Sequence, residues 1–382
     1  MTKIYTYSFF MFILISFATY AQINKTEPLR YSNVKIYITK ADDIKAILKA
    51  GISLDNSKTE IDGIEVILNQ MEIKKVANLG YKYTIEIADI QDYYEKQIRL
   101  PKEQMPLLQQ QMKREYGLKG FEFGSMGGYY TFNQVVAELD SMRLLYPHLI
   151  SQKQSIGTSV EGRDIWMVKI SDNPDFDEDD PEIFYNALIH AREPQSMTSL
   201  MYFMYYLLEN YGSNPLVNYI VENRELYFVP VINPDGYVYN EQTNPNGGGI
   251  WRKNKRDNNN DNTFSPAKDG VDLNRNFSYK WAYDDLGSSP DSSSDVYRGS
   301  APFSEPETQA IRDFCISHNF QMAFNLHAVW GVIFYPYGYD LTVVPPEPDL
   351  SAFIQQGLKM MDYNDYVLQN QQWMLLLQEI HK

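Results

Sequence analysis

Apolar and polar positions alternate over the first quarter of the chain with two different periods. Strand-like apolar runs occur at residues 34–38, 64–68 and 81–87, and helical spacing occurs at residues 42–50 and 71–79. This order predicts strand, helix, strand, helix, strand, with room for a further strand near Ile52. We therefore expect residues 22–90 to form a small α/β sandwich domain.

Residues 91–128 have a different composition and predict a connector with some helix. They are rich in Gln, Lys and Glu and contain Pro101 and Pro106. Three glycines, Gly124, Gly127 and Gly128, close this segment. The pattern then predicts a larger domain over residues 129–382.

The elements predicted after residue 129 are longer and alternate between helix and strand. Thr131 is the expected cap of a helix with one apolar face, a long apolar helix follows Pro194, and Ser304 with Glu307 predicts a capping box for a later helix. Strands are expected at residues 165–170, 183–189, 226–232 and 322–326. The strands at 183–189 and 322–326 are predicted to be buried. This alternation predicts an α/β fold with a mixed, mostly parallel sheet between helices, whose sites lie at the carboxyl ends of strands.

Charge and cysteine content narrow the classes of partner. The 382-residue chain carries a formal net charge of -15. Such a surface repels phosphate backbones, so nucleic acid is excluded as an expected partner. The single cysteine, Cys315, excludes an intrachain disulfide. Nothing in the sequence indicates the oligomeric state.

Residues 1–21 have the pattern of a secretory signal peptide. Lys3 supplies a positive charge, residues 9–17 are apolar, and Thr19-Tyr20-Ala21 matches a small-residue cleavage site. A membrane anchor is the alternative, but the apolar run is short for a span of about 30 Å of hydrocarbon. We expect a secreted protein, extracellular or periplasmic, with no membrane span after removal of the signal.

The segment His190-Ala191-Arg192-Glu193 directly follows a strand that is predicted to be buried. His-x-x-Glu at the end of a strand places an imidazole and a carboxylate close enough to share a metal ion. This tetrapeptide also arises by chance, and it is weak evidence alone.

His327 supplies a third candidate ligand, because it also ends a predicted strand. Two histidines and a glutamate at neighbouring strand ends form a zinc set that leaves the fourth position for water. Each histidine taken alone is more often a hydrogen-bonded core residue. His148, His318 and His381 are interpreted as structural.

Two further segments place arginines where an anion could be bound. Trp251-Arg252-Lys253 follows a glycine-rich loop, and residues 270–276 contain Asp272, Asn274 and Arg275. A guanidinium offers a fixed, permanently charged set of donors to a carboxylate or an oxyanion. The alternative for each arginine is a surface ion pair.

Five motifs in one order resemble the zinc carboxypeptidases of the carboxypeptidase A and T type. They are His-x-Arg-Glu-Pro at residues 190–194, Asn-Pro-Asp-Gly at 233–236, Trp-Arg-Lys at 251–253, Asp-x-Asn-Arg-Asn at 272–276, and Tyr-Pro-Tyr-Gly at 335–338. The resemblance covers residues 129 to about 345. It implies a mixed sheet between helices and an N-terminal prosegment, for which residues 22–90 are the candidate.

The resemblance also implies roles for individual residues. One Zn²⁺ per chain would be bound by His190, Glu193 and His327. Arg252 would stabilise the oxyanion, Asn274 and Arg275 would bind the terminal carboxylate of a peptide or protein substrate, and Arg192 would line an outer subsite. The implied activity is metallocarboxypeptidase proteolysis, the hydrolysis of C-terminal peptide bonds.

The chain departs from the family pattern in one respect. The family's general base is a glutamate on a late strand, preceded by a tyrosine on a mobile loop, and neither is found in a matching context before Lys382; Glu379 is not assigned this role. We therefore expect residues 129–382 to be a C-terminally incomplete catalytic domain, inactive as written if that base is essential. The alternatives are a noncatalytic zinc- and peptide-binding pseudoenzyme and, less favoured by the motifs, an acylamino-acid deacylase.

Overall fold

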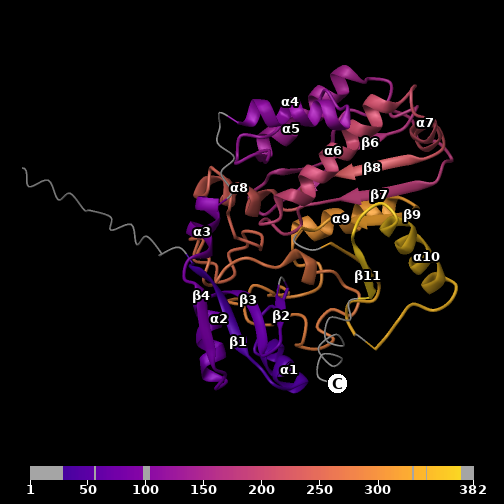
Figure 1. The fold of residues 1–382 in the computed structure, drawn as a ribbon. Helices are drawn as coiled ribbons and strands as arrows, with labels where there is room; N and C mark the ends of the chain where they lie inside the picture. The colour runs from indigo at the N-terminus through magenta and orange to yellow at the C-terminus, as the bar shows by residue number, and fades with distance from the viewer. Residues whose placement is uncertain (1–28, 56, 98–103, 329–330, 341, 371–382) are drawn as a thin grey trace, which may run out of the picture.

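A computed structural model describes residues 29–55, 57–97, 104–328, 331–340 and 342–370. The predicted signal at residues 1–21 and Glu379 lie outside these ranges. Figure 1 shows a small N-terminal unit, drawn in indigo, below a larger unit that contains the main sheet and most of the helices.

The N-terminal unit, residues 31–87, has a four-stranded antiparallel sheet in the order β2-β3-β1-β4. Val34 pairs with both Val66 and Ile85, and alternate residues of β1 enter an apolar core under the two helices. The elements are β1 (Tyr31–Tyr37), α1 (Ala41–Lys49), β2 (Lys58–Glu60), β3 (Gly63–Asn69), α2 (Gln70–Asn78) and β4 (Tyr83–Ile87).

Three of the predicted strands and both predicted helices of this unit are confirmed, whereas the strand expected near Ile52 is wrong. Ile52 lies in the loop between α1 and β2, and its side chain is buried in the core of the unit. Its apolar character therefore reflects the packing of a loop, and the additional strand, β2, forms six residues later and is short.

The connector contains two helices, α3 (Ile90–Gln97) and α4 (Met105–Tyr116), and then a tight turn. Isolated bridges join Gly124 to Gly128 and Met126 to Tyr129. A Cβ atom on Gly124 would lie 2.0 Å from the carbonyl oxygen of Tyr129, so only glycine fits there. The turn delivers the chain to α5 (Phe132–Leu145).

The predicted cap of α5 is confirmed. The side chain of Thr131 accepts a hydrogen bond from the backbone N–H of Gln134, and the Gln134 side chain accepts one from the backbone N–H of Thr131. This reciprocal capping box satisfies two backbone donors that the first turn of a helix leaves without partners.

The larger unit has a five-stranded sheet in the order β5-β6-β8-β7-β9. Pairs β5/β6 and β6/β8 are antiparallel, and pairs β8/β7 and β7/β9 are parallel. The sheet is therefore mixed, as expected, but its described strands pair equally in both directions and are not mostly parallel. The strands are β5 (Gln154–Thr158), β6 (Asp164–Ile170), β7 (Glu182–Asn186), β8 (Glu225–Val229) and β9 (Phe320–Asn325). The first of these was not predicted.

Helices cover both faces of this sheet (Figure 1). Every residue of β8 is buried: Leu226 and Phe228 join the core with α5, α6 and α7, whereas Tyr227 and Val229 pack with α9 on the opposite face. Burial on both faces explains the continuous apolar sequence of residues 226–229 in this strand. The helices are α6 (Pro194–Asn210), α7 (Pro215–Glu222), α8 (Pro234–Thr243) and α9 (Pro306–Ser317).

Two local predictions in this unit are wrong. The strand β9 is largely exposed, with Met322 at 38%, because among the described strands it pairs only with β7 and forms an edge. The helix α9 is not capped by Ser304 and Glu307: Glu305 is its N-cap, and Pro306 occupies the first turn. Proline is well suited to a first turn because its missing N–H would have no helical partner.

The remaining described elements are η1 (Leu273–Arg275), β10 (Val332–Tyr335), α10 (Asp349–Met361) and β11 (Val367–Asn370). β10 and β11 form a separate parallel pair. Within the described ranges, no helix combines the length and apolarity that a membrane crossing requires.

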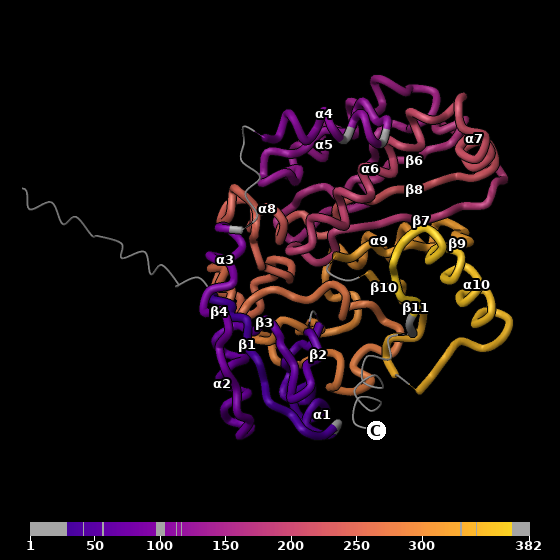
Figure 2. The backbone as a smooth tube through the Cα atoms, viewed as in Figure 1, coloured from indigo at the N-terminus to yellow at the C-terminus, as the bar shows by residue number. Residues whose placement is uncertain are grey.

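The N-terminal unit lies against the long segment between α8 and α9, drawn in orange in Figures 1 and 2. The Tyr31 hydroxyl donates to Asp295 at 3.1 Å, and Lys75 pairs with Asp291 at 2.9 Å. The Ser294 hydroxyl donates to the carbonyl oxygen of Gly51. This interface places the loop between α1 and β2 next to the candidate site.

Candidate active site

Two parallel strands end side by side and position the three predicted metal ligands. Asn186 of β7 pairs in register with Asn325 of β9, and their side-chain amides are hydrogen-bonded. After β7, the chain turns through His190 into α6, for which Glu193 is the N-cap; after β9, it continues to His327. The ligands therefore meet at the carboxyl edge of the sheet, as predicted.

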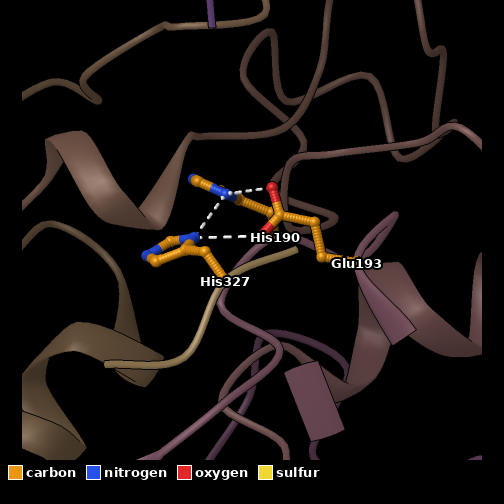
Figure 3. A group of neighbouring side chains, drawn as sticks. All are labelled: His190, Glu193 and His327. Carbon is orange, nitrogen blue, oxygen red and sulfur yellow. Dashed lines mark hydrogen bonds and ion pairs between the residues drawn. The ribbon is translucent and has the colours of Figure 1, made fainter. Parts of the chain in front are cut away.

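The three side chains converge closely (Figure 3). His190 Nδ1 lies 2.8 Å from Glu193 Oε1, His327 Nδ1 lies 2.9 Å from Glu193 Oε2, and the two Nδ1 atoms are 3.2 Å apart. Ligand nitrogens about 2.0–2.1 Å from a tetrahedral zinc ion lie about 3.3 Å from each other. The donor set and its spacing therefore fit one zinc ion.

The ionisation of these groups also suits a metal. Burial lowers the pKa of His327, which favours the neutral imidazole that a metal requires. Burial alone would raise the pKa of Glu193, but His190 and His327 overcome this effect and hold that pKa well below its usual range. A carboxylate thus faces two imidazoles, and His327, with 36% of its side chain exposed, leaves the site accessible on one side.

Asp272 lies between His190 and Arg252. Its Oδ1 lies 3.4 Å from His190 Nε2, a buried nitrogen that has no hydrogen-bond partner in the described part of the chain. Its Oδ2 accepts from Arg252 Nε at 3.0 Å and from Arg252 Nη2 at 2.9 Å. Burial would raise the pKa of Asp272, but the positive charges of Arg252 and Arg275 hold it well below its usual range. Asp272 therefore orients both an imidazole and a guanidinium.

The segment around Arg252 is fixed by backbone contacts to the histidine loop. The N–H of Ala191 donates to the carbonyl oxygen of Arg252 at 3.0 Å. The side chain of Asn240 donates to the carbonyl oxygen of Trp251 and accepts from its N–H. Gly236, from the Asn-Pro-Asp-Gly motif, leaves no room for a Cβ beside the carbonyl oxygen of Lys253. Arg252 is thereby held at 1% exposure beside the metal ligands.

Asn274 and Arg275 lie on η1, directly after Asp272. The Asp272 side chain also caps this short helix, accepting from the N–H of Asn274 at 3.0 Å. Arg275 donates through Nε to the carbonyl oxygen of Gly287, and its side chain is 21% exposed. The structure therefore brings Arg275 near Arg252, with both guanidinium groups directed at a shared carboxylate.

That carboxylate belongs to Asp55, in the loop between α1 and β2. Asp55 Oδ2 lies 2.7 Å from Arg252 Nη2 and 2.9 Å from Arg275 Nη2. Burial would raise the pKa of Asp55, but Arg275 and Arg252 lower it overall, so the side chain is ionised. Sequence reasoning did not find this residue, because nothing in a polar loop indicates a contact with a distant motif.

Arg192 is placed differently from the other predicted residues. Its Nη1 lies 3.3 Å from Asp295 Oδ2, and its side chain is 10% exposed. Asp295 is the residue that also accepts from Tyr31 of the N-terminal unit. Arg192 therefore lies at the boundary between the two units and makes no described contact with Arg252 or Arg275.

The arrangement combines a metal site, a buried cation and a partly exposed cation along one face. A metal at His190, Glu193 and His327 would polarise a carbonyl group, and Arg252 is placed to meet the negative charge that develops on its oxygen. Arg275 could bind a carboxylate of the same molecule, since Asp55 already binds there.

Comparison with known proteins gives one consistent result. The zinc carboxypeptidase family matches residues 135–372. Human mast cell carboxypeptidase A is 31% identical over 258 residues, which cover 66% of this chain and 58% of that protein. Rat carboxypeptidase A2 is 31% identical over 291 residues, covering 75% and 63%. The chain thus spans about three fifths of the length of these curated relatives.

Solved structures agree on the fold. Carboxypeptidase A from Helicoverpa armigera superposes with a TM-score of 0.69 at 22% identity, covering 90% of this chain and 82% of that chain. Thrombin activatable fibrinolysis inhibitor gives a TM-score of 0.63 at 19% identity, covering 91% and 88%. At these identities, the likeness concerns the fold alone, and it extends over both units of the chain.

Proposed function

This chain belongs to the zinc carboxypeptidase family, and on that premise we propose that it is a metallocarboxypeptidase that removes residues from the C-termini of peptides or proteins. The family uses zinc, and a His-Glu-His site is present. The observation that carries the proposal is the convergence of two Nδ1 atoms on one carboxylate beside a buried arginine.

His190, Glu193 and His327 would bind the zinc ion. When bound, zinc supplies a Lewis acid that polarises a carbonyl group and increases the acidity of a water molecule. Arg252 would stabilise the charge that develops on the scissile carbonyl oxygen, and Asp272 would keep its guanidinium in place.

Arg275 and Asn274 would determine where the substrate is cut. A guanidinium that binds the terminal carboxylate places the last peptide bond next to the metal. An internal peptide bond brings no such carboxylate, and it would leave Arg275 without its partner at a cost of a few kcal/mol. Arg192 would contact residues further from the C-terminus only after its surroundings open, because Asp295 now binds it.

We further propose that the N-terminal unit acts as a prosegment that closes this site. Asp55 binds Arg252 and Arg275 together, so a substrate carboxylate must displace it. Asp55 belongs to the N-terminal unit, whereas Arg252 and Arg275 belong to the larger unit. Closure of the site therefore depends on docking of the whole N-terminal unit. We also propose that the protein is secreted, on the basis of the signal-peptide pattern in residues 1–21.

A noncatalytic zinc- and peptide-binding protein is the second candidate, and one observation favours it. Within the described residues, the carboxylates that contact His190, His327, Arg252 or Arg275 are Glu193, Asp272 and Asp55, and each already binds one of these histidines or arginines. None of them is therefore free to serve as the general base, which contributes about 10²–10⁴-fold to rate.

Zinc content and turnover measured on the same sample distinguish the two candidates. We expect one zinc ion per chain, lost on Glu193→Ala, and metal-dependent release of C-terminal amino acids from a mixed peptide pool. Stoichiometric zinc with peptide binding but no release would support the noncatalytic protein. Absence of zinc in the folded chain would overturn both candidates.

A further inference from the structure

A second carboxyl group of the N-terminal unit is buried at the interface with the larger unit. Glu72, in the first turn of α2, is 1% exposed. Its Oε2 accepts from the backbone N–H of Asn69 at 2.9 Å, whereas its buried Oε1 has no hydrogen-bond partner in the described part of the chain. An ionised carboxylate with one oxygen unpaired and removed from water is strongly unfavourable.

A negatively charged group across the interface increases this cost. Asp295 of the larger unit is 4% exposed, and both of its oxygens are engaged: Oδ1 accepts from Tyr31 and Oδ2 from Arg192. As an ionised carboxylate, Asp295 has no hydrogen to donate to Glu72, and its negative charge opposes a second one nearby. Burial and Asp295 together raise the pKa of Glu72 to about 8.

The cations around Glu72 are each bound to another group. Arg192 pairs with Asp295, Lys75 of α2 pairs with Asp291, and Lys253 of the larger unit donates to the carbonyl oxygen of Ser292 at 2.9 Å. The positive charges of Arg192 and Lys75 lower the pKa of Glu72 only in part. The Tyr31 hydroxyl, which also interacts with Glu72, has a pKa raised well above its usual value by burial and stays neutral.

We propose that Glu72 makes docking of the N-terminal unit depend on pH: the docked unit carries a protonated Glu72, and loss of this proton releases it from the site. This inference rests on the proposed function, because it assumes that docking through Asp55 closes the site. A carboxyl group in the first turn of a helix is ionised once water reaches it.

The docking equilibrium depends on pH because the docked and released states bind the Glu72 proton with different affinities. The docked state holds a proton on Glu72 up to about pH 8, whereas the released state loses it near the ordinary value of 4.5. Docking is therefore strongest in acid and weakens about 10-fold per pH unit between these two values. Lys253, whose pKa burial lowers to about 8, acts in the opposite direction only above that pH, so the informative window is pH 5.5–7.5.

A buried thiol at the interface can report opening. Ser294 is 0% exposed, and its hydroxyl donates to Gly51 of the N-terminal unit. In the zinc-loaded full chain with Cys315→Ser, the labelling rate of Ser294→Cys by a maleimide is measured with Glu72 and with Glu72→Gln, which keeps the shape but cannot ionise. Dividing the two rates at each pH removes the pH dependence of the thiol itself.

We expect this rate ratio to rise about 100-fold from pH 5.5 to 7.5. Glu86→Gln, which removes an exposed carboxylate from the same unit, should give a constant ratio against the parent. A constant ratio for Glu72→Gln would overturn the inference. So would an equal rise at Ser171→Cys, a buried position outside the interface, because it would indicate general destabilisation.

Two further variants supply a second reporter position and a separate test of Asp55. If Ser294→Cys does not fold, Ser289→Cys serves as the reporter, since Ser289 also lies against Gly51. Asp55→Asn should speed labelling by a similar factor at every pH in this window. Faster labelling with Asp55→Asn but a constant ratio for Glu72→Gln would reject the role of Glu72 and leave the Asp55 proposal standing. No change with Asp55→Asn would reject closure by the N-terminal unit.

Discussion

Asp55 Oδ2 lies 2.7 Å from Arg252 Nη2, although 197 residues separate them in sequence. The same oxygen lies 2.9 Å from Arg275 Nη2, so one carboxylate is hydrogen-bonded to both Arg252 and Arg275. Charge-assisted hydrogen bonds of this kind contribute about 1.5–3 kcal/mol each. The N-terminal unit is therefore linked electrostatically to the residues proposed to bind substrate.

Removal of this charge should open the site to ligands. We expect Asp55→Asn to bind the blocked dipeptide hippuryl-phenylalanine at least about 10-fold more tightly, because the loss of a charged hydrogen bond favours exchange for the ligand carboxylate. Isothermal titration calorimetry of the zinc-free chain measures this binding without hydrolysis of the ligand. Asp42→Asn, which alters a highly exposed carboxylate of the same unit, is the control and should leave the affinity unchanged. Equal affinity in all three proteins would contradict closure by Asp55.

Arg275→Lys should weaken recognition of a free C-terminus. A lysine keeps the charge but cannot present two parallel donors to a carboxylate. In the zinc-free Asp55→Asn protein, isothermal titration calorimetry should show a loss of about 10–100-fold in affinity for hippuryl-phenylalanine and little change for its amide. Zinc content should not change, since Arg275 contacts none of the three ligands in the described structure. An equal loss for the acid and the amide would refute the assigned role.

Asp272→Asn should weaken both the metal site and the fold. It removes the carboxylate beside His190 Nε2, a change that typically lowers metal affinity about 10–100-fold. It also leaves Arg252 with Asp55 as its carboxylate partner in the described structure, and the loss of the charged hydrogen bonds to Asp272 should cost about 1.5–3 kcal/mol of unfolding free energy. Competition with a zinc chelator and urea unfolding of the apo chain separate the two effects. Unchanged zinc affinity would show that Asp272 does not support His190.

Glu307 provides a test of stability against pH. It is 0% exposed, and burial raises its pKa to about 7. The folded chain therefore holds a proton that the unfolded chain releases near pH 4.5, so the contribution of Glu307 is most favourable below pH 4.5 and is lost as pH rises to about 7. Relative to Glu307→Gln, the wild type should lose about 3 kcal/mol between pH 4.5 and 7.5. Urea unfolding at both pH values measures this, and a constant difference would contradict it.

The sequence was most informative where a local pattern carries the information. His-x-x-Glu after a strand and a histidine after another strand are local signals, and the parallel pairing of β7 with β9 converts them into one cluster. The elements of the N-terminal unit follow in the same way from apolar spacing. The period of the apolar residues predicted these elements, whereas the histidines and the glutamate were informative only together and with the other motifs.

Features that depend on tertiary contacts were not predictable. The contact of Asp55 with the site arises from docking of two units, and no local pattern marks it. Ile52 resembles part of a strand because it is apolar, but it fills a core from a loop. The exposure of β9 depends on which strands pair with it, and the start of α9 was decided by Pro306 rather than by the Ser304 pattern.

The most direct test of the central claim uses two peptides that differ only in a free or an amidated C-terminus. Zinc-loaded Asp55→Asn chain is incubated with each peptide, and the products are identified by mass spectrometry beside an Asp55→Asn, Glu193→Ala control. The account predicts loss of the last residue from the free-acid peptide alone, and no product from the control. Internal cleavage, equal cleavage of the amide, or bound zinc without any product would contradict a metallocarboxypeptidase.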